Sequence, residues 1–444
     1  MALTLVLFLL VVFGLVVAYA AKNRSRFGWW VPPAIVFMLG YPVKWIVWKG
    51  SINSQEFRAR NLSELTWVDG DSLSDLLPTM FGAAIVLFVV FVVSFAGRGR
   101  PPVGAAFLAL PRRFRRWVKI AVIVSLVLLG WRVALGAVMG QSVAGIPFSV
   151  RLITNRGSQV VVAVLVAFAG YASRPLARRI IVGWAIPAGL VTIIGTASRG
   201  ALVKLALPFL FMAWLNPERS GRLLKSIAAI SIVTILFYPV ISQLRLASIS
   251  GEPVGLALIG KSYSKGFSST FRASTNDLVT RVQGLDGIAQ VRHNPSQRIG
   301  WTSAVIRGSI VKDYTVKVVG IRTANDYRSP GFVAAGMLLA GTGLGVVVGP
   351  LIHLFALWVL WAFAGRRRFP VAAKALVLSW ALFAFSEGTV QLQDLVALLI
   401  SAYAVDFVLS RVLQRAPRPR AVDMAGPSPT RIPGVGGYDP RLVP

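Results

Sequence analysis

Long apolar stretches separated by short polar connectors make up most of the chain. Eleven of them have about the length that a helix needs to cross a bilayer. They cover residues 3–21, 28–48, 79–96, 119–140, 157–173, 180–198, 201–215, 226–244, 341–364, 371–386 and 395–412. We therefore predict an all-α polytopic membrane protein with about 11 transmembrane helices. The first stretch has no basic segment before it and no small-residue cleavage site after it, so we expect it to remain as a span.

Cations concentrate in every second connector. Six segments hold 26 of the 47 Lys and Arg residues, against only three acidic residues. These segments are 22–26, 98–119, 174–179, 218–225, 366–374 and the C-terminal residues 411–444. Because short cytoplasmic connectors of membrane proteins are enriched in Lys and Arg, we expect these segments to face the cytoplasm. An odd number of spans then places the N-terminus outside and the C-terminus in the cytoplasm.

One connector on the outer side is much longer than the rest. Residues 245–330 carry twelve cations and five acids, a net charge that runs against the sorting rule for an outer segment. Connectors of this length are usually functional or contain structure of their own. We thus predict helices 1–8 in 1–244, a basic extracytoplasmic loop with short helices in 245–330, helices 9–11 in 331–412, and a disordered cytoplasmic tail in 413–444.

An amphipathic helix is predicted inside this loop. Leu278, Val282, Leu285, Ile288 and Val291 recur at spacings of three and four, with polar residues between them. Such a helix could lie on the outer membrane surface, cover a cavity from outside, or pack on a small core within the loop. The spacing alone favours none of the three.

Charge and composition exclude several kinds of binding partner and catalytic site. A net charge of +31 would indicate nucleic-acid binding in a soluble protein, but here membrane sidedness accounts for most of it, so we expect no nucleic-acid partner. The absence of Cys excludes disulfides, iron–sulfur clusters and thiol catalysis. With only two His residues, we expect no metal site and no cofactor.

Several arginines lie inside or beside the outer ends of predicted spans, or in the basic loop. A cation at such a place is costly unless it is paired, reaches lipid phosphate, or faces a wet cavity. Together these residues predict a positive, outward-facing cavity suited to a lipid-linked phosphate or pyrophosphate, since guanidinium binds phosphate oxygens in pairs. The candidates are Arg132, Arg151, Arg156, Arg199, Arg245, Arg298, Arg322 and Arg328.

Cleavage of a sugar–pyrophosphate bond would also require a base to take the proton of the attacking hydroxyl. The outer side offers few groups for this role: Asp313, Asp326 and His293 in the loop, and Glu387 and Asp394 in the last outer turn. Each is also explained by an ordinary solvated or hydrogen-bonded position. His353 falls inside an apolar stretch, where a bond between helices is favoured. Gly341 to Gly345 resembles a nucleotide loop, but no strand precedes it, so close helix packing explains it better.

Three motifs bear a resemblance to a known family. They read Thr-Ala-Ser-Arg-Gly at 196–200, Thr-Ala-Asn-Asp-Tyr-Arg-Ser-Pro-Gly at 323–331 and Gly-Thr-Gly-Leu-Gly at 341–345. With the eleven spans and the late basic loop, they resemble the Wzy-type O-antigen and oligosaccharide repeat-unit polymerases. That family shares its fold with the O-antigen ligases, within the GT-C-like class of glycosyltransferases.

The resemblance implies a polysaccharide polymerase of the bacterial cytoplasmic membrane. It would transfer a growing glycan from undecaprenyl pyrophosphate to a sugar hydroxyl of the next lipid-linked repeat, at the outer face and without a nucleotide sugar. Membrane lipids, a chain-length regulator and a flippase are the implied partners. Arg199 falls on the family's Ser-Arg-Gly turn. The ligases' His is missing near Asp326, which leaves Asp326, His293 or Glu387 as the catalytic base.

Two other functions fit the same residues, and a third fits only some of them. A lipid-linked sugar flippase or anion transporter also needs a basic membrane cavity, and it predicts discontinuous helices at the bilayer midplane. A ligase-like enzyme would make a single transfer. A scaffold for acidic cell-surface polymer would leave Arg132 and Arg199 unexplained.

Overall fold

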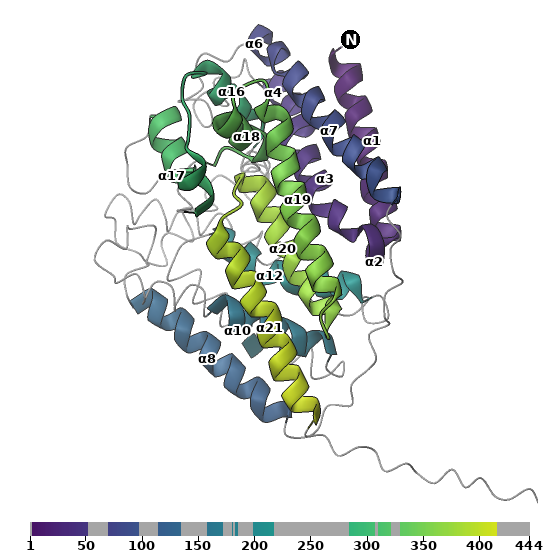
Figure 1. Ribbon diagram of the computed structural model, residues 1–444, viewed down its shortest axis with the longest axis vertical. Coiled ribbons are helices and arrows are strands. Elements are labelled where there is room, and N and C mark those ends of the chain that lie inside the picture. Colours follow the sequence, from purple (N-terminus) through teal and green to yellow (C-terminus); the bar gives the residue numbers. More distant parts are fainter. Residues whose placement is uncertain are drawn as a thin grey trace, which may run out of the picture.

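The computed structural model describes residues 2–51, 70–96, 114–134, 158–171, 180, 183–184, 199–216, 284–306, 310–320 and 329–414 (Figure 1). Every regular element in these ranges is a helix, which confirms the predicted all-α class. Most of the predicted loop 245–330, and the chain beyond Gln414, lie outside the described residues.

Six of the described helices are long and apolar enough to cross a membrane. They are Ala2–Lys22, Arg24–Gly50, Leu73–Phe95, Gly345–Gly365, Pro370–Glu387 and Leu392–Arg411. Their outer faces carry large apolar side chains, among them Phe8, Ile85 and Phe407, which are each 61% exposed. On helices long enough to cross a bilayer, apolar surface of this extent is typical of contact with lipid. The chain is therefore an integral membrane protein, and six of the eleven predicted spans coincide with these helices.

Three further apolar stretches also form helices in the described residues. They are α8 (Phe114–Ala134), α10 (Ser158–Tyr171) and α12 (Arg199–Leu215), which match the predicted stretches 119–140, 157–173 and 201–215. The predicted stretch 226–244 lies outside the described residues, as does nearly all of 180–198.

The second span is irregular along its length. It contains α2 (Arg24–Phe27), η1 (Gly28–Trp30), α3 (Val31–Met38), the π-helical turn η2 (Leu39–Val43) and α4 (Lys44–Ser51). Pro42 lies inside η2, where its missing N–H and its ring prevent a regular α-helical turn. Wide turns of this type are frequent at functional sites.

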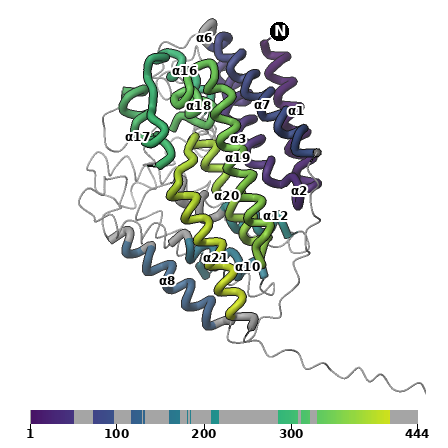
Figure 2. The backbone as a smooth tube through the Cα atoms, in the orientation of Figure 1, coloured from purple at the N-terminus to yellow at the C-terminus, as the bar shows by residue number. Residues whose placement is uncertain are grey.

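The helices pack in a consistent lateral order. α1 (Ala2–Lys22) packs on α3, and α7 (Leu77–Ala96), which follows α6 (Gly70–Asp75), packs on α19 (Gly345–Gly365). α20 (Pro370–Glu387) contacts α3, α12 and α19, while α21 (Leu392–Gln414) contacts α10, which in turn contacts α8. Figure 2 shows α19 and α20 in the middle, with α1 and α7 on one side and α8 on the other. The centre of the bundle is thus built from the first and last parts of the chain.

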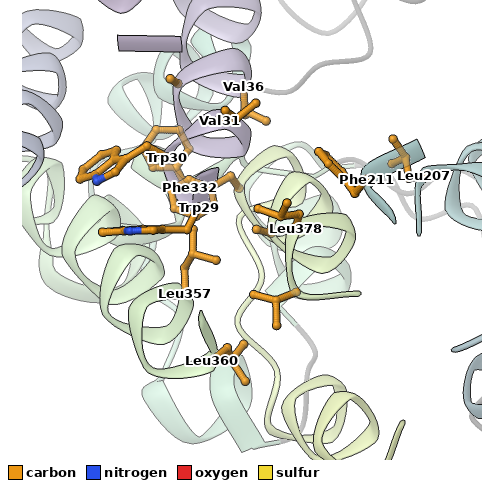
Figure 3. Close-up of a cluster of buried hydrophobic side chains, with 14 of the residues drawn as sticks. Trp29, Trp30, Val31, Val36, Leu207, Phe211, Phe332, Leu357, Leu360 and Leu378 are labelled. Carbon is orange, nitrogen blue, oxygen red and sulfur yellow. The ribbon is translucent and has the colours of Figure 1, made fainter. Parts of the chain in front are cut away.

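The core between these helices is aromatic and aliphatic. Figure 3 shows Trp29 and Trp30 of the second span beside Leu357 of α19, with Leu378 of α20 and Phe211 of α12 in the same cluster. The two indole rings are 4.7 Å apart between centroids. Because lipid is as apolar as these side chains, close packing and not burial from water holds the helices together here.

Basic side chains cap helix ends at one end of the bundle. Arg24 donates from Nη1 to the Trp214 carbonyl at the end of α12, at 3.1 Å, and Arg26 donates from Nη2 to the Phe95 carbonyl at the end of α7, at 2.9 Å. Cations are favourable there because the carbonyl end of a helix carries partial negative charge. The ends of α1, α7 and α12 therefore meet at one end of the bundle, which we call the basic end, as the alternation of cations predicted.

The start of α20 belongs to the same end. Lys374 donates from Nζ to the Ser25 carbonyl at 3.1 Å. Asp406 of α21 accepts from the backbone N–H of Arg368 at 3.4 Å and of Phe369 at 3.2 Å, just before α20 begins. A carboxylate at this position satisfies N–H groups that have no partner inside the helix.

At the opposite end, which we call the loop end, short helices cover the bundle. They are α16 (Leu285–His293), η5 (Thr302–Ile306), α17 (Ile310–Asp313), η6 (Tyr314–Val318) and α18 (Phe332–Ala340). α16 contains the last three apolar positions of the predicted amphipathic helix, Leu285, Ile288 and Val291, all fully buried. Its apolar face packs on α18, so in the described part this helix neither lies on the membrane surface nor packs only within the loop.

α18 and α19 form a tight hairpin. A Cβ added at Gly336 would overlap the backbone of Gly345 and Gly349, and one added at Gly345 would overlap Met337. Gly341, with φ of +101°, turns the chain between the two helices. Within the Gly341-to-Gly345 motif, Gly345 therefore serves close packing and Gly341 serves the turn, while nothing lies within 4 Å of a Cβ added at Gly343.

Candidate functional site

A buried ion pair joins the second span to the loop end. Lys44 Nζ lies 2.9 Å from Asp286 Oδ1, with Lys44 only 2% exposed and Asp286 20% exposed. The Gly284 N–H donates to the same carboxylate oxygen at 3.0 Å. Asp286 lies in the first turn of α16, where a negative charge is stabilised by the helix dipole. An ionisable residue inside a span is a candidate functional residue by default, and here its partner is identified.

The local sequence explains how the two groups meet. Lys44 directly follows the π-helical turn η2, which offsets it from a regular helical register. The Gly284 backbone lies against the Gly40 carbonyl so closely that any Cβ at Gly284 would overlap it. The Trp48 ring lies one helical turn after Lys44, with 5.8 Å between the ring centroid and Nζ, and adds a weak cation–π attraction. The start of α16 is thereby fixed to the second span.

The first turn of α18 lies inside the bundle beside this ion pair. Phe332 is fully buried, with ring centroids 5.5 Å from Tyr41 and 5.2 Å from Phe385. The Val333 N–H donates to the Tyr41 hydroxyl at 3.4 Å. At nine residues, α18 is too short to cross a bilayer, and it rises from the interior to the hairpin turn at the loop end. Non-helical backbone at such depth is tolerated only where protein or a water-filled cavity surrounds it.

Two other elements close on the start of α18. A Cβ at Gly287 of α16 would overlap the Pro330 carbonyl, and one at Gly388, directly after α20, would overlap the Gly331 carbonyl. Gly331 and Gly388 both have positive φ, at +75° and +68°. The last two residues of the 323–331 motif are therefore held between α16 and the end of α20.

Three of the predicted site residues have described side chains. His293 is exposed at the last position of α16, and Glu387 is half-buried at the last position of α20. Arg298 donates from Nη1 to the Met337 carbonyl at 3.2 Å and so caps the end of α18. Arg298 contacts the carboxyl end of α18. Glu387 lies at the end of α20, next to the start of α18. These two ends are separated by the length of α18, about 13 Å.

The other predicted site residues have no described side chains. Arg132 and Arg199 lie on α8 and at the start of α12, and only their backbone positions are described. Six others lie outside the described residues: Asp326, Arg151, Arg156, Arg245, Arg322 and Arg328. The predicted arginine-lined cavity stays a prediction.

The other titratable candidates have structural contacts. Asp313 Oδ1 lies 3.9 Å from Lys317 Nζ, one helical turn away. His353 is buried in α19 between Phe332 and Phe385, and its Nδ1 lies 2.8 Å from the Gly349 carbonyl of its own helix. Because a carbonyl only accepts, Nδ1 carries the proton. Asp394 lies in the first turn of α21, where a carboxylate is favourable.

Sequence reasoning missed the residues that the structure brings together. Lys44 is a cation inside the apolar stretch 28–48, which was a sufficient signal to select it. Asp286 lies on the polar side of the predicted amphipathic helix, and only the fold pairs it with a residue 242 positions away. Nothing in the sequence marked Tyr41 as a site residue, because its hydroxyl has a role only through its contact with the start of α18.

No His, Asp or Glu cluster that could hold a metal ion occurs in the part of the chain that the structure describes. Comparison with known proteins adds no identification. No protein family, no curated protein and no solved structure matches the chain.

Proposed function

We propose that this protein polymerises lipid-linked oligosaccharide repeat units at the outer face of the bacterial cytoplasmic membrane. The observation that carries the proposal is the position of the 323–331 motif. Its last residues, Pro330 and Gly331, lead directly into the buried helix α18 and are held between α16 and α20. This motif resembles one of the O-antigen polymerases, and it ends at irregular backbone inside the helix bundle. A reaction centre embedded in the membrane is expected at such a place.

The sidedness of the reaction follows from charge. At the basic end, cations donate to the last carbonyls of α7 and α12 and to the Ser25 carbonyl of α2, and the positive-inside rule assigns such an end to the cytoplasm. The loop end, with α16 and the α18–α19 hairpin, then faces outward. A donor whose lipid is undecaprenyl pyrophosphate would reach this end from the outer leaflet.

The proposed reaction breaks one bond and forms one. The bond between the anomeric carbon of the donor sugar and a pyrophosphate oxygen breaks, and the electron pair stays on the leaving undecaprenyl pyrophosphate. The acceptor hydroxyl oxygen bonds to that carbon, and its proton passes to a base, for which Asp326, His293 and Glu387 are the candidates. Arginines, with Arg199 first among them, would stabilise the charge that grows on the leaving oxygens.

A ladder assay tests the proposal. Purified protein is incubated with undecaprenyl-pyrophosphate-linked repeat units, and the products are separated by size. We expect a ladder of longer glycans, lost in Arg199→Ala and kept in Arg366→Ala, which removes an exposed arginine at the basic end. A single product would indicate ligase-like transfer. Failure of the wild-type protein to make any product from competent substrate would contradict an enzymatic function.

Transport of a lipid-linked sugar is the second candidate. The π-helical turn with Pro42 in the second span and the short buried helix α18 are the discontinuous helices expected of transporters. Movement of labelled lipid-linked repeat across liposomes without any glycan ladder would favour this function.

A further inference from the structure

Residues 299–306 and 310–320, which we call the surface segment, have one face turned to the bundle. This part of the chain forms η5, α17 and η6. Its buried side chains are Ile299, Ala304, Ile310, Tyr314, Thr315 and Val318, each 5% exposed or less. The segment is therefore fixed in orientation, and its other face has a defined direction.

Among the exposed side chains of the segment, three are large and apolar and two are basic. Trp301 is 48% exposed, Ile306 60% and Val316 43%. Lys312 and Lys317 are also exposed, and Asp313 offsets part of their charge through its contact with Lys317. Trp with aliphatic side chains and Lys is the composition that proteins place at the boundary between headgroups and acyl chains.

The surface segment adjoins a lipid-facing surface of the bundle. η5 packs against α21, and Figure 1 shows the η5–α17 region beside the start of that helix at the loop end. The first half of α21 exposes Leu392, Val396 and Ile400 at 47%, 44% and 53%. Lipid already covers this part of α21. The bilayer is therefore the nearest apolar surface that the exposed side chains of the segment can contact.

We propose that the surface segment docks on the bilayer at the loop end, as a membrane-interface anchor. Trp301, Ile306 and Val316 enter the boundary between headgroups and acyl chains, while the Lys312 and Lys317 stems extend along it and bring their ammonium groups to anionic phosphates. The proposal rests on the membrane location of the chain and on the geometry of the segment. It does not depend on the proposed glycosyl transfer.

Spin labelling tests the anchor in the full-length protein. The chain contains no Cys, so Ile306→Cys and Val316→Cys each give a single labelling site. The labelled protein is placed in nanodiscs of phosphatidylethanolamine and phosphatidylglycerol. Collision of the nitroxide with oxygen, which concentrates in lipid, is compared with collision with the water-soluble complex NiEDDA. Ile400→Cys in α21 is the lipid control, and Lys312→Cys is the headgroup-side control within the segment.

We expect the ratio of oxygen to NiEDDA collisions to be several-fold higher at 306 and 316 than at 312, and to approach the ratio at 400. Equal NiEDDA access at 306, 316 and 312 would overturn the anchor, because the face would then lie in water. Low access to both reagents at 306 and 316 would overturn it as well, because protein would then cover the face. All four sites are exposed, and an unchanged circular dichroism spectrum shows that each variant folds.

Discussion

Lys44 shows how one charged side chain can be kept inside a membrane protein. With 2% of its surface exposed, its ammonium is separated from water, and Asp286 at 2.9 Å replaces the lost solvation. Taking one partner away from such a pair leaves an uncompensated charge, which costs more than the pair itself contributes. The Gly284 N–H on the same carboxylate adds a second constraint on its position.

We expect Asp286→Ala to lower the free energy of unfolding by about 3–5 kcal/mol, because Lys44 loses its ion-pair partner in a buried place. Lys317→Ala is the matched control: it removes an exposed lysine whose ion pair with Asp313 has a longer separation, 3.9 Å, and should cost less than about 1 kcal/mol. Unfolding in detergent measures both. The double change Lys44→Met with Asp286→Ala should recover much of the loss, and a double variant as unstable as Asp286→Ala would contradict a dominant role for the charge.

The limits of sequence reasoning are clearest for single residues. Arg298 is predicted as a phosphate ligand from its charge and its place in the basic loop, and in the structure its Nη1 donates to a carbonyl at the end of α18. Sequence spacing cannot distinguish these roles, because both use the same guanidinium donors. Lys44 could have been selected, since a cation within an apolar stretch already requires a partner.

At the scale of elements, the regular spans follow from the sequence and the broken ones do not. α1, α7 and α21 match their predicted stretches within a few residues because apolar length alone determines them. α18 was not predicted. The apolar run from 332 to 364 is too long for one span, and Gly341 divides it, but only tertiary packing shows that the first part is a separate helix.

The α18–α19 hairpin should not tolerate a single methyl group at its contact. In Gly336→Ala the new Cβ would overlap the Gly345 carbonyl and the Gly349 backbone, so the two helices must separate. We expect a loss of about 2 kcal/mol or more in unfolding free energy, within the range for overpacked cores. Gly14→Ala in α1 is the control, since no atom lies within 4 Å of its added Cβ. It should leave stability unchanged or raise it slightly, as Ala favours helix.

A smaller effect of Gly336→Ala than of Gly14→Ala would show that the hairpin is not tightly packed. Thermal unfolding of both variants in the same detergent makes the comparison, and the surface segment should be unaffected in either.

At the scale of the whole molecule, the distribution of cations decides orientation. The basic end collects the ends of α1, α7 and α12 and the start of α20, in agreement with the alternation in the sequence. Which compartment this end faces depends on the positive-inside rule. The predicted count of eleven spans is a whole-molecule property too, and six of them have described helices of sufficient length and hydropathy.

Cysteine labelling tests the orientation, since the native chain has no Cys. Gly343→Cys places a thiol in the exposed turn of the α18–α19 hairpin, and Arg366→Cys places one at the exposed end of α19. In intact cells we expect a membrane-impermeant maleimide to label position 343 at once, and position 366 only after the membrane is opened. The reverse pattern would place the basic end outside and would also contradict the proposed function.

The contact of Asp406 with the start of α20 has a consequence for biosynthesis. The backbone N–H groups of Arg368 and Phe369 have their acceptor on α21, which the ribosome makes only after α20. Until α21 has been inserted, the preceding helix lacks this acceptor, so α20 and α21 should mature as a pair. A chain that ends before residue 406 would therefore have a truncated α21 and also an α20 without its acceptor. We expect quality-control proteases to degrade both helices.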